Sequence, residues 1–360
     1  MHRVVMGYVV LAGVLFTGCS PQTGTPVGDG VDVVAVVEDL TQPVAMAFAP
    51  DGRLFVTEKI GRLRVITDGA LVETPALTVS VNSIGERGLL GVAVHPDFSE
   101  NGWFYLYYTT GDSLSGDLEN RVARYTMDGN TALGPEETIV SLPGSPGPNH
   151  NGGNVHFGPD GKLYVTIGDL TIRDNAQDLD ALTGRMHRYN DDGSIPEDNP
   201  FGADNPTYAL GLRNSFDFAV DPVTGLIYAT ENSTTSHDEV NRIVAGENYG
   251  WPEVQGAGSD AAFVDPLIDI TGFSVSPTGI DFAPNDFYGS QAESDLFYAE
   301  YLTGRVLRVD LGGTDRDEVV TETVFLEGVI GITDIAFDAT GQLYVLSLTA
   351  NTLYRVDRSQ

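Results

Sequence analysis

Residues 44–58 read VAMAFAPDGRLFVTE, and this pattern returns five more times along the chain. Each copy has an apolar alternation, then Pro-Asp-Gly or an Asn/Asp-rich substitute, then a second apolar segment typified by Leu-Tyr-Val. Alternation with a period of two predicts a strand and Asp-Gly predicts a tight turn, so each copy predicts a β-hairpin. The further copies are 88–109, 153–169, 216–231, 279–300 and 333–347.

More strand-like segments follow several hairpins, at 61–67, 120–127, 304–311 and 351–357. Six copies of three to four strands predict an all-β fold, a six-bladed β-propeller over residues 31–360. Two stacked sheets are the alternative, but a sandwich gives six like units no reason to repeat. The strand at 31–40 has no place in the first hairpin, so we expect it to pair with 351–357 and close the ring. A helical turn is expected only within 175–190.

The charge balance excludes one class of partner. The chain has 51 acidic and 19 basic residues and a formal net charge of −32. Nucleic-acid phosphates require Lys and Arg, so we expect no nucleic-acid partner. Lys59 and Lys162 are the only lysines, which argues against a lysine nucleophile or Schiff base.

The N-terminus resembles a leader rather than a folded segment. Residues 1–19 combine a short positive start, an apolar run and small residues before Cys19, the sole cysteine. This pattern predicts a signal of the bacterial lipoprotein type, although ordinary cleavage with an incidental cysteine is the alternative. Residues 20–30 predict a flexible tether. We therefore expect an exported protein, periplasmic or on the cell surface, held to a membrane only by a lipid on Cys19.

The first candidate site lies in the segment PNHNGGNVHFGPDGKLYVTIGD (148–169). Two glycines after His150 allow a sharp bend that leaves the imidazole open to a ligand. Asp169 ends the second strand of the same hairpin, and a carboxylate there suits a histidine that works as a general base. A loop histidine and a turn-capping aspartate are the simpler interpretation, and the residues alone do not decide between them.

Three more polar clusters stand beside predicted strands. Glu86 lies in IGERGLLG (84–91), and Arg213 and Asn214 lie in YALGLRNSFDF (208–218). The loop at 229–252 gathers oxygen ligands of the kind that Ca²⁺ prefers, from Glu231, Asn232, Asp238 and Glu239. Salt bridges, turn caps and a solvated acidic loop are the alternatives for these clusters.

The ordered motifs ERGLLGVAVHPDF, HNGGNVHFGPDGKLYVTIGD, LRNSFDF and DEVNRIVAGENYGWP resemble the soluble PQQ-dependent aldose dehydrogenases, the glucose/sorbosone dehydrogenase family. The segment NAQDLDALTGRMHRYNDDGSIPEDNPF between them is similar to the family pattern LxGKxxRxxxDGxIPxDNPF. The resemblance covers about residues 38–357, and 148–252 is its most specific part. A single PDGxLYV hairpin would be weak support, because many propellers have one.

The resemblance implies PQQ- and calcium-dependent oxidation of an aldose, or a related alcohol, at C1. His150 would be the general base, Asp169 its orienting carboxylate, and Arg213 would stabilise charge on the quinone. Residues assigned by this resemblance to cofactor binding are Glu86, Asn214, Asn232, Ser274 and Arg305. Residues assigned to calcium are Ser233 and Thr234, through main-chain oxygens, and Asp238 and Glu239. The substrate would be a small sugar, and the external electron acceptor is not identified.

Several positions depart from the family pattern. Glu86 stands where sugar dehydrogenases usually have Gln, and Asn232-Ser233-Thr234 replaces a Gln/His-Gly-Pro run. Leu302 stands where the family has a Lys, with Arg305 the nearest cation, and Gly331 and Thr333 stand where it has two Arg. PQQ carries three carboxylates, and each lost charge-assisted pair removes about 1.5–3 kcal/mol of binding free energy.

Two alternative functions stay open: a non-enzymatic propeller that binds a glycan or protein, and a calcium-dependent hydrolase or lactonase.

Overall fold

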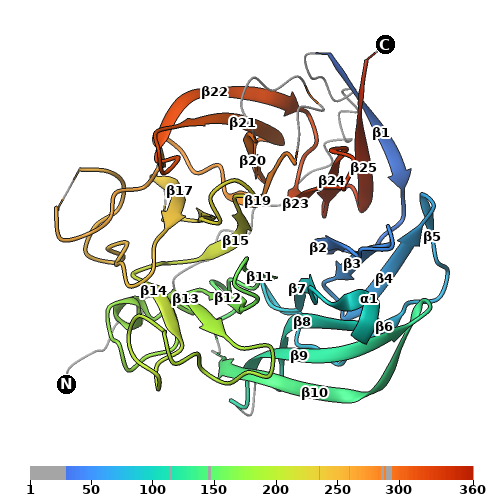
Figure 1. The fold of residues 1–360 in the computed structure, drawn as a ribbon, viewed down its shortest axis with the longest axis horizontal. Helices are drawn as coiled ribbons and strands as arrows, with labels where there is room; N and C mark the ends of the chain where they lie inside the picture. Colours follow the sequence, from blue (N-terminus) through green and yellow to red (C-terminus); the bar gives the residue numbers. More distant parts are fainter. Residues whose placement is uncertain are drawn as a thin grey trace, which may run out of the picture.

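The fold is a ring of six antiparallel blades, five with four strands and one with five, as the repeats predict (Figure 1). The computed structural model describes residues 30–359 apart from 114–115, 145–146, 235, 259, 285–287 and 289–293. The predicted leader and most of the tether therefore lie outside the described residues. No helix within the described part is long and apolar enough to cross a membrane.

The first three blades hold the first three predicted hairpins as their inner strand pairs. Blade 1 contains β2 (Pro43–Phe48), β3 (Leu54–Glu58), β4 (Arg62–Thr67) and β5 (Ala70–Leu71), with β6 (Leu77–Thr78) also paired to β4. Blade 2 contains β7 (Leu89–Val94), β8 (Trp103–Thr110), β9 (Glu119–Asp128) and β10 (Thr131–Pro143). Blade 3 contains β11 (Val155–Phe157), β12 (Leu163–Ile167), β13 (Arg185–Tyr189) and β14 (Thr207–Leu210).

The remaining blades repeat this plan. Blade 4 contains β15 (Ser215–Val220), β16 (Ile227–Glu231), β17 (Asp238–Ile243) and β18 (Ile268–Ile270). Blade 5 contains β19 (Pro277–Phe282), β20 (Leu296–Glu300), β21 (Arg305–Gly312) and β22 (Glu318–Glu327). Blade 6 contains β23 (Ile332–Phe337), β24 (Leu343–Ser347), β25 (Thr352–Arg358) and, as its outer strand, the N-terminal β1 (Val31–Val37). Val31 lies opposite Arg358 in that last pair.

Turn chemistry fixes the hairpins. Gly52, Gly161 and Gly341 have φ values of 86°, 70° and 88°, and each donates its N–H to the carbonyl three residues earlier. Glycine adopts this left-handed conformation without a steric penalty, so these positions close the turns between inner strands. The expected helical turn at 175–190 is only a 3₁₀ turn, η1 (Arg173–Ala176), while a short α1 (Phe98–Asn101) lies in the blade 2 hairpin.

The innermost strands β2, β7, β11, β15, β19 and β23 contact one another in a closed circle around the channel. Buried aspartates link consecutive blades there: Asp217 accepts from the Ile280 N–H at 3.1 Å, and Asp334 accepts from the Met46 N–H at 2.6 Å. Asp281 accepts from the Phe337 N–H at 2.8 Å, and burial raises the pKa of Asp281 to about 6. These carboxyl groups join consecutive blades around the channel, so the loops at its mouth extend from a fixed framework.

Candidate functional site

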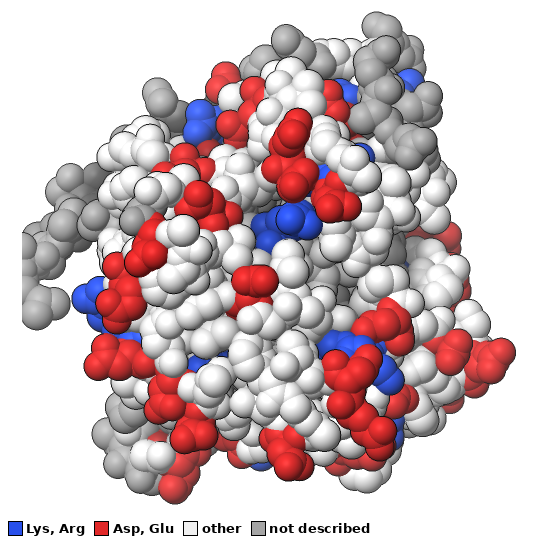
Figure 2. Space-filling model, turned by 60° about the vertical axis from the view of Figure 1, so that its left-hand side comes forward, with Lys and Arg blue, Asp and Glu red and all other residues white. Residues whose placement is uncertain are grey.

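A cavity of about 450 Å³ opens at one mouth of the channel, and every blade contributes to its wall. Blade 1 gives Lys59, blade 2 gives Glu86, and blade 4 gives Asn214 and Asn232. Apolar side chains, among them Phe216 and Leu302, form much of the remainder. Acidic side chains are spread over the face drawn in Figure 2, with basic ones in isolated clusters. The cavity is therefore a partly apolar pocket of a size that suits a small ligand.

His150 is held at the edge of this cavity by its own backbone. It has a φ of 59°, its N–H donates to Oε2 of Glu86 at 2.6 Å, and its carbonyl accepts from the Leu170 N–H at 3.2 Å. A Cβ on Gly168 would lie 2.2 Å from that carbonyl, so glycine is required for the approach. A non-glycine residue in the left-handed region persists only where its surroundings impose it, as they do here.

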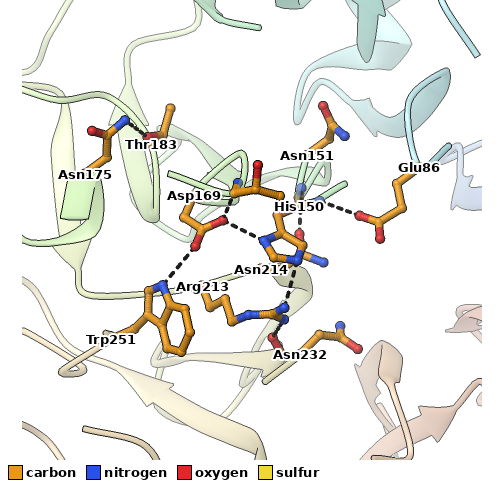
Figure 3. Close-up of polar contacts among 12 residues, drawn as sticks. Glu86, His150, Asn151, Asp169, Asn175, Thr183, Arg213, Asn214, Asn232 and Trp251 are labelled. Carbon is orange, nitrogen blue, oxygen red and sulfur yellow. Dashed lines mark hydrogen bonds and ion pairs between the residues drawn. The ribbon is translucent and has the colours of Figure 1, made fainter. Parts of the chain in front are cut away.

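Asp169 fixes the orientation of the imidazole through Nδ1 (Figure 3). Nδ1 of His150 lies 2.6 Å from Oδ1 of Asp169, whose side chain is fully buried. The same carboxylate accepts from the Thr171 N–H at 2.7 Å and, through Oδ2, from Nε1 of Trp251 at 2.9 Å. Three donors around one buried carboxylate hold it in a single orientation, so the imidazole plane is fixed as well.

Arg213 faces the other imidazole nitrogen. Its Nη2 lies 2.8 Å from Nε2 of His150, and the guanidinium carbon lies 5.4 Å from the centre of the Trp251 ring. A guanidinium can only donate hydrogen bonds, so Nε2 must be the acceptor and Nδ1 must carry the proton that goes to Asp169. The site therefore holds a neutral histidine whose lone pair is directed away from Asp169, the form that a general base requires.

Glu231 anchors the segment that carries Arg213 and Asn214. Its Oε1 accepts from the Arg213 N–H at 2.9 Å and from the Asn214 N–H at 2.5 Å. Burial raises the pKa of Glu231 to about 8, against the effect of these two N–H donors. Asn214 in turn accepts from the Gly152 N–H at 3.0 Å, so blade 4 also supports the loop of His150.

The sequence analysis named Glu231 only as an oxygen ligand of the 229–252 loop and missed its role in anchoring Arg213 and Asn214, yet a signal for that role was present. Glu58, Glu231 and Glu300 end the second strand of blades 1, 4 and 5, and all three are buried. Glu58 accepts from the Thr41 N–H just before β2, as Glu231 does just before β15. This repeated glutamate is a structural device of the blade, and in blade 4 it positions two residues of the site.

Four assigned ligands lie elsewhere or are already engaged. Both oxygens of Asp238 accept hydrogen bonds. Oδ1 accepts from the Ser233 N–H, and Oδ2 accepts from Ser274 Oγ and from the next two backbone N–H groups. Glu239 accepts from Asn241 and from the Gly256 N–H. Arg305 pairs with the buried Glu300 at 2.6 Å. Asp238, Glu239, Ser274 and Arg305 do not line the cavity; they stabilise the loops and strands around it.

The loop expected to bind calcium does not fit that ion as it stands. Nη1 of Arg213 donates to the main-chain oxygens of Asn232 at 2.7 Å and Ser233 at 2.6 Å. Thr234 has its hydroxyl on Oε1 of Gln255 at 3.0 Å. Among the described residues no group of three or more His, Cys, Asp or Glu side chains could hold a metal. A calcium ion on this loop stays a prediction, and it requires Arg213 to release the carbonyl oxygen of Ser233.

Two of the positions that depart in charge from the family pattern lie in the wall of the cavity. Leu302 and Thr333, where the family resemblance leads one to expect cations, do face the cavity and leave it uncharged there. Lys59 is the one cation and Glu86 the one carboxylate among the described lining residues. The sequence analysis did not assign Lys59 to the site, because it lies in the turn directly after the first hairpin and outside the motifs that carry the family resemblance.

Comparisons with known proteins find relatives of this chain in sequence and in structure. The family model described as glucose/sorbosone dehydrogenase matches residues 40–355. Quinoprotein glucose dehydrogenase B of Acinetobacter calcoaceticus is 34% identical over 266 residues, 65% of this chain and 55% of that protein. The PQQ-bound aldose sugar dehydrogenase of Streptomyces coelicolor is 28% identical, with a TM-score of 0.80 over 91% of this chain and 98% of that one. Mouse Hedgehog-interacting protein is 30% identical over 259 residues, 60% of this chain and 37% of that protein.

Proposed function

The chain belongs to the glucose/sorbosone dehydrogenase family, and on that premise we propose that it is a PQQ-dependent oxidoreductase that oxidises an aldose, or a related alcohol, at C1. The observation that carries the proposal is the neutral His150 held between Asp169 and Arg213. Its Nε2 lone pair is available to a hydroxyl proton once the guanidinium of Arg213 moves aside.

The cavity suits PQQ in its volume and in its apolar walls. Among the described residues, its lining has only one cation for the three carboxylates of PQQ. Its volume of about 450 Å³ holds a flat tricyclic molecule, with apolar walls from Phe216, Leu302 and other residues. Asn214, Asn232 and Thr278 offer polar groups in the wall, and Lys59 offers a positive charge. When bound, PQQ supplies a two-electron acceptor for the hydride from C1.

The residues of the chain supply the proton transfer and the orientation. Nε2 of His150 takes the C1 hydroxyl proton while the C1 hydrogen leaves as hydride, so a cyclic aldose becomes a lactone. Asp169 stabilises the imidazolium that results, because its carboxylate already accepts from Nδ1 at 2.6 Å. Arg213, which now donates to His150 at 2.8 Å, would place its positive charge beside a bound acceptor and stabilise negative charge there.

The test is reconstitution. The purified protein is mixed with PQQ, and the reduction of an artificial electron-acceptor dye is followed with a panel of aldoses. We expect saturable PQQ binding at micromolar cofactor and dye reduction with at least one sugar. Absence of binding would overturn the proposal.

A second candidate is a non-enzymatic propeller that binds a glycan or a protein at the same mouth. The uncharged wall at Leu302 and Thr333 favours it, because an anionic cofactor gains nothing there. It predicts a stable protein that binds no PQQ in the same titration. The hydrolase alternative has no comparable support.

Export and lipid attachment at Cys19 are also part of the proposal. They rest on the leader pattern of residues 1–19. Mass spectrometry of the mature N-terminal peptide tests them: we expect a diacylglyceryl-modified Cys19 as the first residue, and an unmodified N-terminus would contradict this.

A further inference from the structure

Lys59 occupies a fixed position at the wall of the cavity, directly after β3. Its N–H donates to the Gln42 carbonyl at 2.9 Å, and its carbonyl accepts from the Leu89 N–H at 3.1 Å. A Cβ on Gly88 would lie 2.3 Å from that carbonyl, so blade 2 packs closely against this turn. The backbone of Lys59 is therefore held from blade 1 and blade 2 together, and its side chain lines the cavity.

The ammonium group of Lys59 has donors to spare. Its Nζ donates to the Ser83 carbonyl at 2.7 Å, the one hydrogen bond recorded for it within the described chain. An ammonium carries three donors, so two remain for a ligand. The side chain is half-buried, and burial lowers the pKa of Lys59 while Glu86 opposes that shift. No ion pair joins Lys59 to Glu86 among the described residues, although both line the cavity.

Neighbouring cations are engaged with buried carboxylates instead. Arg62 and Arg64 both reach Glu58, at 2.7 and 3.4 Å, and Arg305 reaches Glu300. Lys59 forms no ion pair with a carboxylate among the described residues, and it is the one cation among the described residues that line the cavity, in a chain with a net charge of −32. It is positioned where an anionic ligand would meet it.

We propose that Lys59 binds a carboxylate of the cofactor and is its principal charge partner in the cavity. This inference rests on the proposed function. Blade 1 lies across the ring from blade 4, which carries Arg213 and Asn214 (Figure 1). A ligand that spans the cavity would be oriented by these two blades. Its anionic end would lie at Lys59 and its opposite end at the residues around His150.

Equilibrium titrations with PQQ and with its trimethyl ester, which lacks the negative charges, test this pairing. We expect Lys59→Met to weaken PQQ binding roughly tenfold or more, the effect of losing one charge-assisted contact. The ester should bind wild type and Lys59→Met alike, and Lys59→Arg should retain most of the affinity for PQQ. Lys162→Met is the matched control, because Lys162 is the only other lysine and bonds to Asn190 outside the cavity.

Lysine modification of the wild-type protein gives a second measurement that does not depend on the variant folding. PQQ should protect Lys59 from amine acylation and leave the reactivity of Lys162 unchanged, as read by peptide mass spectrometry. PQQ binding that is equal in wild type and Lys59→Met, or binding without protection of Lys59, would overturn the inference and leave the proposed function standing. Absence of PQQ binding in the wild type would overturn both.

Discussion

Nη2 of Arg213 lies 2.8 Å from Nε2 of His150, across the imidazole from the carboxylate of Asp169. Because the guanidinium can only donate, this contact assigns the proton to Nδ1 and the lone pair to Nε2. The same guanidinium donates to two carbonyl oxygens of the 232–233 loop. Arg213 therefore links the base to the loop where the family resemblance implies a calcium ion, and the guanidinium occupies both the imidazole nitrogen and the loop carbonyls.

Asp169→Asn tests the orienting role of the carboxylate. An amide in this place accepts through one oxygen only, so it cannot serve His150, Thr171 and Trp251 together, and the imidazole loses its preferred tautomer. We expect kcat to fall roughly 10²- to 10⁴-fold, with the Kd for PQQ little changed. Steady-state dye reduction and a PQQ titration measure the two quantities, and an unchanged kcat would exclude the orienting role.

Glu86→Gln tests the charge at the cavity wall. Glutamine keeps an oxygen for the His150 N–H, which Glu86 now holds at 2.6 Å, and removes one negative charge near the cofactor carboxylates. We expect PQQ to bind about two- to tenfold more tightly at low salt, with a smaller gain at high salt. Glu73→Gln, at an exposed position outside the lining, is the control. Weaker binding by Glu86→Gln would show that the carboxylate itself is a ligand contact.

Glu231 makes stability depend on pH with a definite sign. Its pKa is raised to about 8 in the folded protein from 4.5, so the folded state holds the proton more tightly than the unfolded chain. The stabilisation is fully present below about pH 4.5 and is lost as the pH rises toward 8. We expect the free energy of unfolding of the wild type to fall by a few kcal/mol more than that of Glu231→Gln over this range. Denaturant titrations at pH 5 and pH 8 measure it, and parallel curves would contradict the shift.

A calcium ion on the 232–234 loop would compete with Arg213 for the Ser233 carbonyl oxygen. Since the guanidinium already holds that oxygen at 2.6 Å, and Asp238 and Glu239 are engaged in the loop, we expect PQQ to bind equally in EDTA and in added calcium. Titrations of the protein with PQQ in each of the two buffers give the Kd values to compare. Binding that disappears in EDTA and returns with calcium would show instead that Arg213 releases the carbonyl when the ion arrives.

The fold followed from the sequence because each blade repeats a local rule. Period-two alternation, with a positive-φ glycine in the hairpins of blades 1, 3 and 6, specifies the local structure, and six copies leave few ways to bury their faces. The helix expected within 175–190 does not form: η1 (Arg173–Ala176) overlaps that segment at two residues only, and Arg185 donates to the Asn175 and Asp178 carbonyls, which a helix would need for its own hydrogen bonds. Local patterns do not reveal when a tertiary contact occupies the carbonyl groups of a segment.

The site was only partly accessible to sequence reasoning. His150, Asp169 and Arg213 were expected together, and the structure brings them within hydrogen-bond distance. Asp238 and Glu239 looked like metal ligands because a sequence shows carboxylates but not the backbone N–H groups that occupy them. Lys59 was not assigned because its role depends on which strand turns face the cavity, a property of the closed ring rather than of any one motif.

The most direct test of the account is a single-turnover experiment with PQQ-loaded wild type and PQQ-loaded His150→Ala. An aldose that supports dye reduction is mixed with each protein, and the absorbance of the bound cofactor reports its reduction. We expect rapid reduction by the wild type and a rate at least about 10²-fold lower in His150→Ala, with equal PQQ loading of the two proteins. Equal rates of cofactor reduction in the two proteins would contradict the assignment of His150 as the base.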